Sequence, residues 1–132
     1  MPDGLWGAMN TCRVVLVVED EPLVRMDLVQ TLEDVGYRCL EASSAMEAIA
    51  LLEEHPEIRV VFTDVQMPGN MDGIELARYV RERWPPTIIV VASGKVDLAS
   101  CLLPEGANRL AKPYDPAKLR HLLTDIEYRL AI

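Results

Sequence analysis

The sequence predicts an α/β fold with a mostly parallel sheet, and two observations support this fold class. Short apolar runs rich in β-branched residues alternate with amphipathic stretches along the chain. The apolar runs are continuous, as is typical of strands that are buried on both faces. A chain of 132 residues has the length of one domain with one hydrophobic core. Residues 1–11 show no periodicity, so we expect a loose N-terminal arm there and the folded domain over residues 12–132.

Five strands follow from the apolar runs. The clearest is Arg13–Val18, which is almost entirely valine and leucine, and Thr87–Ala92 has a similar composition. The strands are predicted over residues 13–18, 37–42, 59–63, 87–92 and 108–111.

Four helices follow from apolar residues at helical spacing and from local start and stop signals. Pro22 suits the first turn of a helix, and Gly36 suits its C-terminal end. Ser44–Glu47 and Asp72–Glu75 have the form of capping boxes, and Asp115 precedes a first-turn proline. The helices are predicted over residues 22–35, 44–52, 72–84 and from 115 to the C-terminus.

Charge and composition exclude several classes of protein. With 13 Lys and Arg against 21 Asp and Glu, the net charge of −8 argues against a nucleic-acid partner. No apolar run reaches the roughly 18 residues that span a bilayer, so we expect no membrane partner. The N-terminus does not resemble a secretion signal, and Cys12, Cys39 and Cys101 lack the spacing of metal ligands. We therefore expect reduced thiols and a cytoplasmic location.

Charged and polar residues follow four of the predicted strands. Glu19-Asp20-Glu21 follows the first strand and Asp64 the third, while Ser93 ends the fourth and Lys112 the fifth. Because the carboxyl ends of parallel strands lie at one edge of a sheet, these side chains are expected to converge. Grouped carboxylates repel one another unless a cation is present, and oxygen ligands favour Mg²⁺. A carboxylate nucleophile beside a lysine and a hydroxyl is suited to phosphoryl transfer.

Each of these residues also has an ordinary structural interpretation. The acidic run favours the positive end of a helix, Asp64 is a common turn residue, and Ser93 suits a loop. Lys112 precedes a proline and is consistent with a solvated strand end. Their combination at four strand ends favours a functional site.

These motifs closely resemble the receiver domain of two-component response regulators. The matching segments are Val-Leu-Val-Val-Glu-Asp-Glu-Pro22, Phe-Thr-Asp-Val-Gln-Met-Pro68, Met-Asp-Gly73, Ala-Ser-Gly94 and Lys-Pro113. The resemblance covers residues 12 to about 130, so residues 12–132 are expected to form a receiver domain. It implies a flavodoxin-like, doubly wound, five-stranded parallel sheet in the order 2-1-3-4-5.

The resemblance also implies the roles of individual residues. Asp64 corresponds to the phospho-accepting aspartate, Lys112 to the lysine that pairs with a phosphoryl oxygen, and Ser93 to the switch hydroxyl. Gln66 and Lys95 lie where side chains tune the rate of dephosphorylation.

A metal site is part of the same implication. Asp20 and Asp64 are expected to ligate Mg²⁺ or Mn²⁺ directly, with the backbone carbonyl of Gln66 as a further ligand. The acidic pair is Glu-Asp rather than the commoner Asp-Asp, and Glu19 is expected to supply a carboxylate that acts through water.

The chain departs from the family pattern in three further ways. The loop Met67–Gly73 is one residue longer than usual, and Gly69-Asn70 suits a turn at its tip. The segment between Ser93 and Lys112 is about three residues shorter than usual, so we expect a short or irregular fourth helix. Arg109 replaces the aromatic residue with which the switch hydroxyl is normally coupled.

The expected function is that of a phospho-accepting receiver. A sensor histidine kinase or a histidine phosphotransfer protein is the expected phosphoryl donor, with a downstream target protein as a further partner. Such a protein catalyses its own phosphorylation and slow dephosphorylation without being a conventional enzyme. Output by onward phosphotransfer and output by docking remain alternatives. So do a receiver excised from a hybrid kinase or longer regulator, and a binding module independent of phosphorylation. A Mg²⁺-dependent hydrolase on this fold is disfavoured, because no histidine or second general base lies at a strand end.

Overall fold

A computed structural model describes residues 13–67, 69–94, 103–112 and 114–131 of the protein. The predicted N-terminal arm, Lys95, and residues 95–102 of the segment expected to hold the fourth helix lie outside the described residues. No helix in the described part is long and apolar enough to cross a bilayer.

The five predicted strands are present and form one parallel sheet. The strands are β1 (Val14–Val18), β2 (Arg38–Ala42), β3 (Ile58–Asp64), β4 (Ile88–Ser93) and β5 (Asn108–Ala111). They pair in the order β2-β1-β3-β4-β5, and every pair is parallel. The predicted α/β class and strand order are therefore confirmed.

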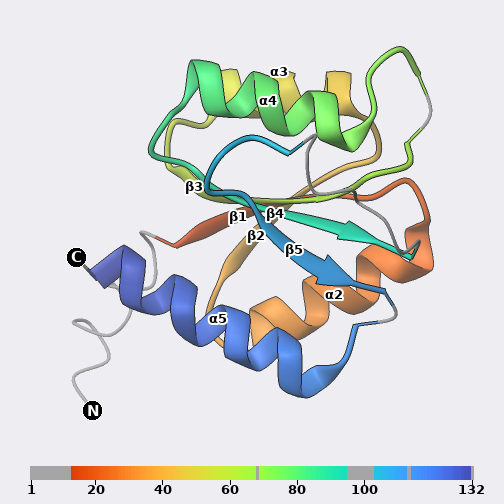
Figure 1. Ribbon diagram of the computed structural model, residues 1–132. Coiled ribbons are helices and arrows are strands. Elements are labelled where there is room, and N and C mark those ends of the chain that lie inside the picture. Colours follow the sequence, from red (N-terminus) through yellow and green to blue (C-terminus); the bar gives the residue numbers. More distant parts are fainter. Residues whose placement is uncertain (1–12, 68, 95–102, 113, 132) are drawn as a thin grey trace.

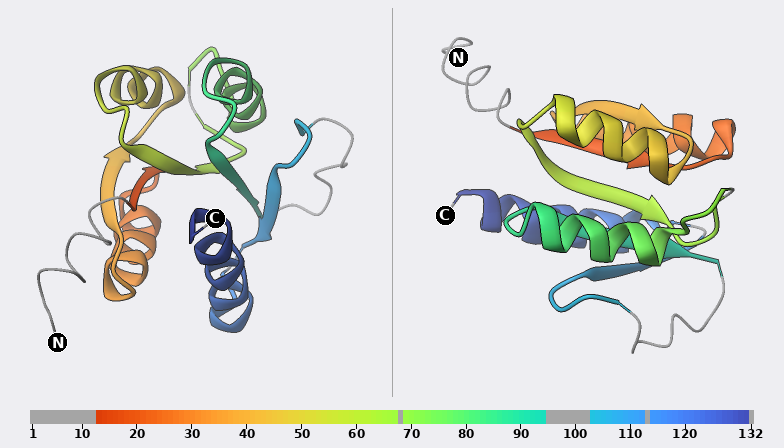
Figure 2. Two further views of the ribbon diagram at one scale, coloured as in Figure 1. Left: turned by 90° about the vertical axis from the view of Figure 1, so that its left-hand side faces the viewer. Right: turned by 90° about the horizontal axis from the view of Figure 1, so that it is seen from above.

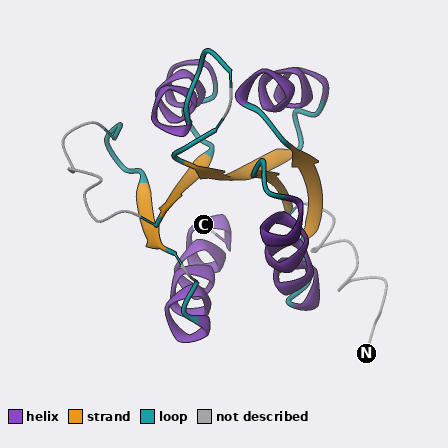
Figure 3. Ribbon diagram, turned by 90° about the vertical axis from the view of Figure 1, so that its right-hand side faces the viewer, coloured by secondary structure: helices purple, strands orange, loops and turns teal. Residues whose placement is uncertain are grey.

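Four helices of the described chain cover the sheet. Labelled as in Figure 1, they are α2 (Pro22–Asp34), α3 (Ala45–Glu54), α4 (Gly73–Arg83) and α5 (Pro116–Ala131). Helices α3 and α4 lie on one face of the sheet, and α2 and α5 lie on the other (Figures 1 and 2). The view along the sheet in Figure 3 shows this arrangement of three layers.

The core explains why the strand sequences are uninterrupted runs of apolar residues. Every residue of β1 is at most 1% exposed, because helices cover both faces of this strand. Val14, Leu16 and Val18 pack on the side of α3 and α4, whereas Val15 and Val17 pack on the side of α2 and α5. Side chains alternate between faces along a strand, so burying both faces requires apolar residues at every position.

The local start and stop signals are confirmed with one exception. Asp72 and Glu75 form a complete capping box, and Gly36 follows α2 with a φ of 105°. The Ser44 side chain accepts a hydrogen bond from the backbone N–H of Glu47. The predicted capping box also requires the Glu47 carboxylate to accept from the N–H of Ser44, and this part of the prediction was wrong. The carboxylate instead accepts from the N–H of Ser43 at 2.6 Å. The backbone of the N-cap residue Ser44 is extended, with a φ of −153° and a ψ of 165°.

The described part of the connection from β4 to β5 contains no helix. Residues 103–107 form a turn in which Gly106 has a φ of 84°, a conformation that favours glycine. Leu103 and Ala107 pack against the core on the side of α3 and α4. Since residues 95–102 lie outside the described part, the expected short or irregular fourth helix stays a prediction.

Gly73 is where α4 meets the end of β3, and its lack of a side chain permits that contact. A Cβ atom at Gly73 would overlap the backbone carbonyl of Asp64 and lie 2.9 Å from the Cα of Val65. The N–H of Gly73 also donates to the carbonyl of Val65 at 2.8 Å. The glycine therefore sets how closely the helix supports the residue expected to accept phosphate.

We expect Gly73→Ala to lower the free energy of unfolding by about 2 kcal/mol, because the overlap involves backbone atoms that cannot rotate away. Denaturant titration measures this change. The matched control is Gly94→Ala, where the nearest atom to an added Cβ is 3.9 Å away, and its stability should stay close to that of wild type. Equal stability of the two variants would contradict this account of Gly73.

Candidate functional site

Three carboxylates converge at the carboxyl ends of β1 and β3, as the sequence predicted. Oxygen atoms of Glu19, Asp20 and Asp64 all lie within 4.8 Å of one another. They border a hollow of about 570 Å³ at this edge of the sheet. The hollow is lined by Glu19, Asp20, Glu21, Val24, Asp64, Gln66, Met67 and Lys112.

Lys112 reaches across the sheet to this acidic group. Its Nζ lies 2.7 Å from Glu19 Oε1 and 3.3 Å from Asp64 Oδ2. Burial by itself lowers the pKa of Lys112, but the hydrogen bond that Lys112 donates to Glu19 and the charges of Asp64 and Glu19 outweigh it and raise the pKa. Lys112 is therefore held in its charged form, and it neutralises part of the negative charge at the site.

Glu19 is the most enclosed of the three acids, at 2% exposed. Its backbone N–H donates to the carbonyl of Ala42 at 3.0 Å. Its Oε2 accepts from the N–H of Glu21 at 3.1 Å, and its Oε1 accepts from Lys112. Both oxygens of this buried carboxylate thus have partners, which satisfies the requirement for burying a charge.

Asp20 and Asp64 are the carboxylates that remain accessible to a ligand. Asp20 is exposed, and the side chain of Asp64 is 12% exposed. Gln66, whose carbonyl was a predicted metal ligand, also lines the hollow. A group of oxygen donors beside an open hollow matches the preference of Mg²⁺ for carboxylates, carbonyls and water. The residues present therefore fit the metal that the sequence led us to expect.

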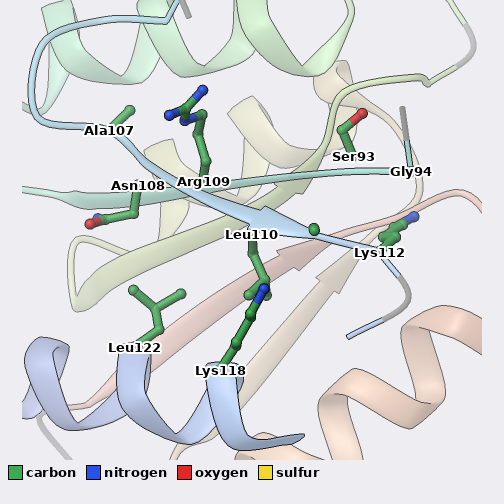
Figure 4. Close-up of a pocket in the computed structure, with 10 residues that line it drawn as sticks. Ser93, Gly94, Ala107, Asn108, Arg109, Leu110, Lys112, Lys118 and Leu122 are labelled. Carbon is green, nitrogen blue, oxygen red and sulfur yellow. The ribbon is translucent and has the colours of Figure 1, made fainter. Parts of the chain in front are cut away.

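Ser93 stands at the end of the neighbouring strand and borders a second hollow, of about 770 Å³. Figure 4 shows Ser93 and Lys112 at the ends of β4 and β5, with Arg109 projecting from β5. Ser93 is 8% exposed, and its carbonyl accepts from the N–H of Lys112 at 2.9 Å. Lys112 lines both hollows. Arg109 is exposed.

Two residues near the site were not identified from the sequence. Arg25 of α2 donates from Nη1 to the carbonyl of Glu19 at 2.7 Å. Tyr114 is partly buried, and burial, followed by the negative charges of Glu19 and Asp64, raises its pKa. One signal was available, because Arg25 is the only basic residue in α2 and follows the acidic run by one helical turn.

Comparison with known proteins assigns the class. Residues 15–124 match the family described as "Response regulator receiver domain", and the chain belongs to this family. It is therefore a receiver domain of two-component signalling. The members of this family generally bind Mg²⁺ and interact with histidine kinases, and the acidic group described above is compatible with that metal.

Individual relatives differ in length. The chain is 32% identical over 118 residues to a chemotaxis protein CheY homolog of Campylobacter jejuni, covering 85% of this chain and 90% of that protein. It is 32% identical over 122 residues to the two-component response regulator PprB of Pseudomonas aeruginosa, covering 88% of this chain. The match spans only 44% of PprB.

A solved structure gives the same result for the fold. The response regulator protein TrrA of Thermotoga maritima, in complex with Mg(2+)-BeF, superposes with a TM-score of 0.74 at 25% identity. The superposition covers 86% of this chain and 97% of TrrA.

We expect Lys112→Ala to lower the free energy of unfolding by about 2 kcal/mol in the absence of metal, because it leaves Glu19 buried without its cationic partner. The same variant should bind Mg²⁺ at least as tightly as wild type, since a competing positive charge is gone. Denaturant titration and calorimetric Mg²⁺ titration measure the two effects. Loss of Mg²⁺ binding would show instead that Lys112 is needed to assemble the acidic group.

Proposed function

We propose that the protein is a phospho-accepting receiver and that Asp64 is its phosphoryl acceptor. The observation that supports this most directly is the position of the Asp64 carboxylate. It lies 3.3 Å from the ammonium of Lys112 and within a group of oxygen ligands, and its side chain is 12% exposed. A carboxylate with a cation on one side and solvent access on the other is suited to act as a nucleophile.

The proposed transfer starts from a phosphohistidine on a histidine kinase or a histidine phosphotransfer protein. An Asp64 oxygen attacks phosphorus, the P–N bond breaks, and the departing imidazole nitrogen keeps the bonding pair and is neutralised by a proton. The product is an acyl phosphate on Asp64. In the reset, water attacks phosphorus and the O–P bond to Asp64 breaks, with the bonding pair returning to the Asp64 carboxylate. Inorganic phosphate leaves, and a proton passes to solvent.

The surrounding residues are assigned supporting roles in the proposal. Mg²⁺, or Mn²⁺, would stabilise negative charge on the phosphoryl oxygens when it is bound. Asp20, Asp64 and the carbonyl of Gln66 would hold the ion, and Glu19 would act through water. Lys112 would pair with a phosphoryl oxygen of the product.

The response to phosphorylation is proposed to involve the second hollow. Ser93 would turn toward the phosphoryl group. Its position would be coupled to that of Lys112, because the two residues stand at the ends of the neighbouring strands β4 and β5. Arg109 replaces the usual aromatic residue, so this coupling would not use a ring. Gln66 and Lys95 would tune dephosphorylation. The absence of a nucleic-acid partner stays a prediction, since this chain spans only 44% of PprB.

Two exposed apolar side chains support docking of a protein donor beside the acidic hollow. Leu23 is 79% exposed and Met26 is 61% exposed, and both belong to the first turns of α2. Their neighbours Glu21 and Val24 line the hollow itself. Exposed leucine and methionine so close to a site of transfer suit contact with the apolar surface of a partner.

We expect wild-type protein incubated with Mg²⁺ and acetyl phosphate to gain one phosphoryl group, and Asp64→Asn to gain none, because the amide is not a nucleophile. Intact mass spectrometry measures the adduct. The matched control is Asp34→Asn at the end of α2, which should be labelled like wild type. Label on Asp64→Asn would contradict the assignment. An unlabelled wild type that also takes no phosphoryl group from histidine kinases would favour a module independent of phosphorylation.

We expect Leu23→Glu to slow transfer from a phosphorylated histidine kinase at least about 10-fold, because it places a charge in an apolar contact. Labelling by acetyl phosphate should stay within about twofold of wild type, since a small donor needs no docking surface. Radiolabel transfer assays measure both rates. Met46→Glu, at a side chain 67% exposed on α3, is the control and should leave both rates unchanged. Equal slowing with both donors would contradict a role in docking.

A further inference from the structure

Arg25 connects three elements beneath the acidic site. It belongs to α2, and its Nη1 donates to the backbone carbonyl of Glu19 at 2.7 Å, directly after β1. Its Nε donates to Glu41 Oε1 at 3.0 Å, on β2. The Arg25 side chain is 20% exposed, whereas that of Glu41 is 47% exposed. The bond to Glu19 is therefore the more enclosed of the two, and it involves the backbone of the acidic loop.

The carbonyl of Glu19 matters because it belongs to the peptide unit that leads into Asp20. A peptide unit is planar, so holding its oxygen sets the plane and the direction in which the chain enters Asp20. No hydrogen bond from another described residue holds the Asp20 carboxylate, which is exposed. The position of this carboxylate thus depends on the backbone that precedes it.

Other contacts hold the Glu19 side of the loop, but none replaces this one. The N–H of Glu19 donates to Ala42, and Glu19 Oε2 accepts from the N–H of Glu21. These bonds anchor the amide and the carboxylate of Glu19, whereas Arg25 holds its carbonyl. The guanidinium is suited to this task because it presents donors in a rigid plane to two acceptors at once.

We propose that Arg25 is a positioning residue for metal binding, holding the Glu19–Asp20 peptide so that Asp20 points toward Asp64. The proposal rests on the proposed function, which supplies the role of Asp20 as a metal ligand. The positioning role and simple electrostatics predict opposite changes in Mg²⁺ affinity when Arg25 is removed. Removing a positive charge near an acidic site should strengthen cation binding, whereas loss of a positioning residue should weaken it.

The test measures Mg²⁺ affinity by calorimetric titration and labelling by acetyl phosphate at subsaturating Mg²⁺. Arg25→Met keeps the length of the side chain and removes both donors, and it should weaken Mg²⁺ binding about 10-fold. Arg25→Lys retains one donor and should recover part of this loss. Labelling of Arg25→Met should return toward the wild-type rate at saturating Mg²⁺, which a general folding defect would not allow.

The matched control is Glu41→Gln, which weakens the partly exposed ion pair and leaves the bond to the Glu19 carbonyl in place. Its Mg²⁺ affinity should stay within about twofold of wild type, as expected for an exposed ion pair. A readout without metal is amide hydrogen exchange, which should be faster at Asp20 and Glu21 in Arg25→Met than in Glu41→Gln.

Each outcome has one meaning. Weaker Mg²⁺ binding in Arg25→Met, partial recovery in Arg25→Lys and little change in Glu41→Gln support the proposal. Unchanged or tighter Mg²⁺ binding in Arg25→Met, or an equal loss of Mg²⁺ binding in Glu41→Gln, overturns the positioning role. If the wild type is labelled in the same experiments, the proposed function stands. A wild type that takes no phosphoryl group but shows the Mg²⁺ pattern would overturn the proposed function alone. A wild type that binds no Mg²⁺ would overturn the positioning role.

Discussion

The contacts of Lys112 with Glu19 and Asp64 are the interaction on which the arrangement of the site depends. These three side chains come from the ends of β5, β1 and β3. The carboxylates of Glu19 and Asp64 repel each other in a partly buried place. One ammonium 2.7 Å and 3.3 Å from the two acids offsets that repulsion without a metal. The site can therefore exist before any ligand arrives, which keeps its residues preorganised.

Burial divides the acids into two kinds. Glu19 is 2% exposed, and its carboxylate accepts hydrogen bonds from Lys112 and from the N–H of Glu21. Asp20 and Asp64 face the hollow and remain accessible. The buried Glu19 and the exposed Asp20 are thus adjacent residues after β1, whereas Asp64 stands at the end of β3.

The backbone around the site is supported from both faces of the sheet. On one face, α4 approaches Asp64 closely because Gly73 has no side chain. On the other, α2 reaches the loop after β1 through Arg25, which donates to Glu19 and Glu41. Helices on opposite faces of the sheet therefore contact the backbone at Glu19 and at Asp64. The loop after β3 and the loop after β1 are held by rigid elements, as precise sites require.

Much of this was readable in the sequence, since it depends on local patterns. Continuous valine-rich runs such as Val14–Val18 identify strands buried on both faces, and Asp72–Glu75 identifies the start of α4. The parallel topology then predicted that Glu19, Asp20, Asp64 and Lys112 meet at one edge. Only the tertiary structure decided how they share that edge. The pairing of Lys112 with Glu19, the contact of Gly73 with Asp64 and the bond from Arg25 to Glu19 join residues through space, and their distances depend on packing that no local pattern encodes.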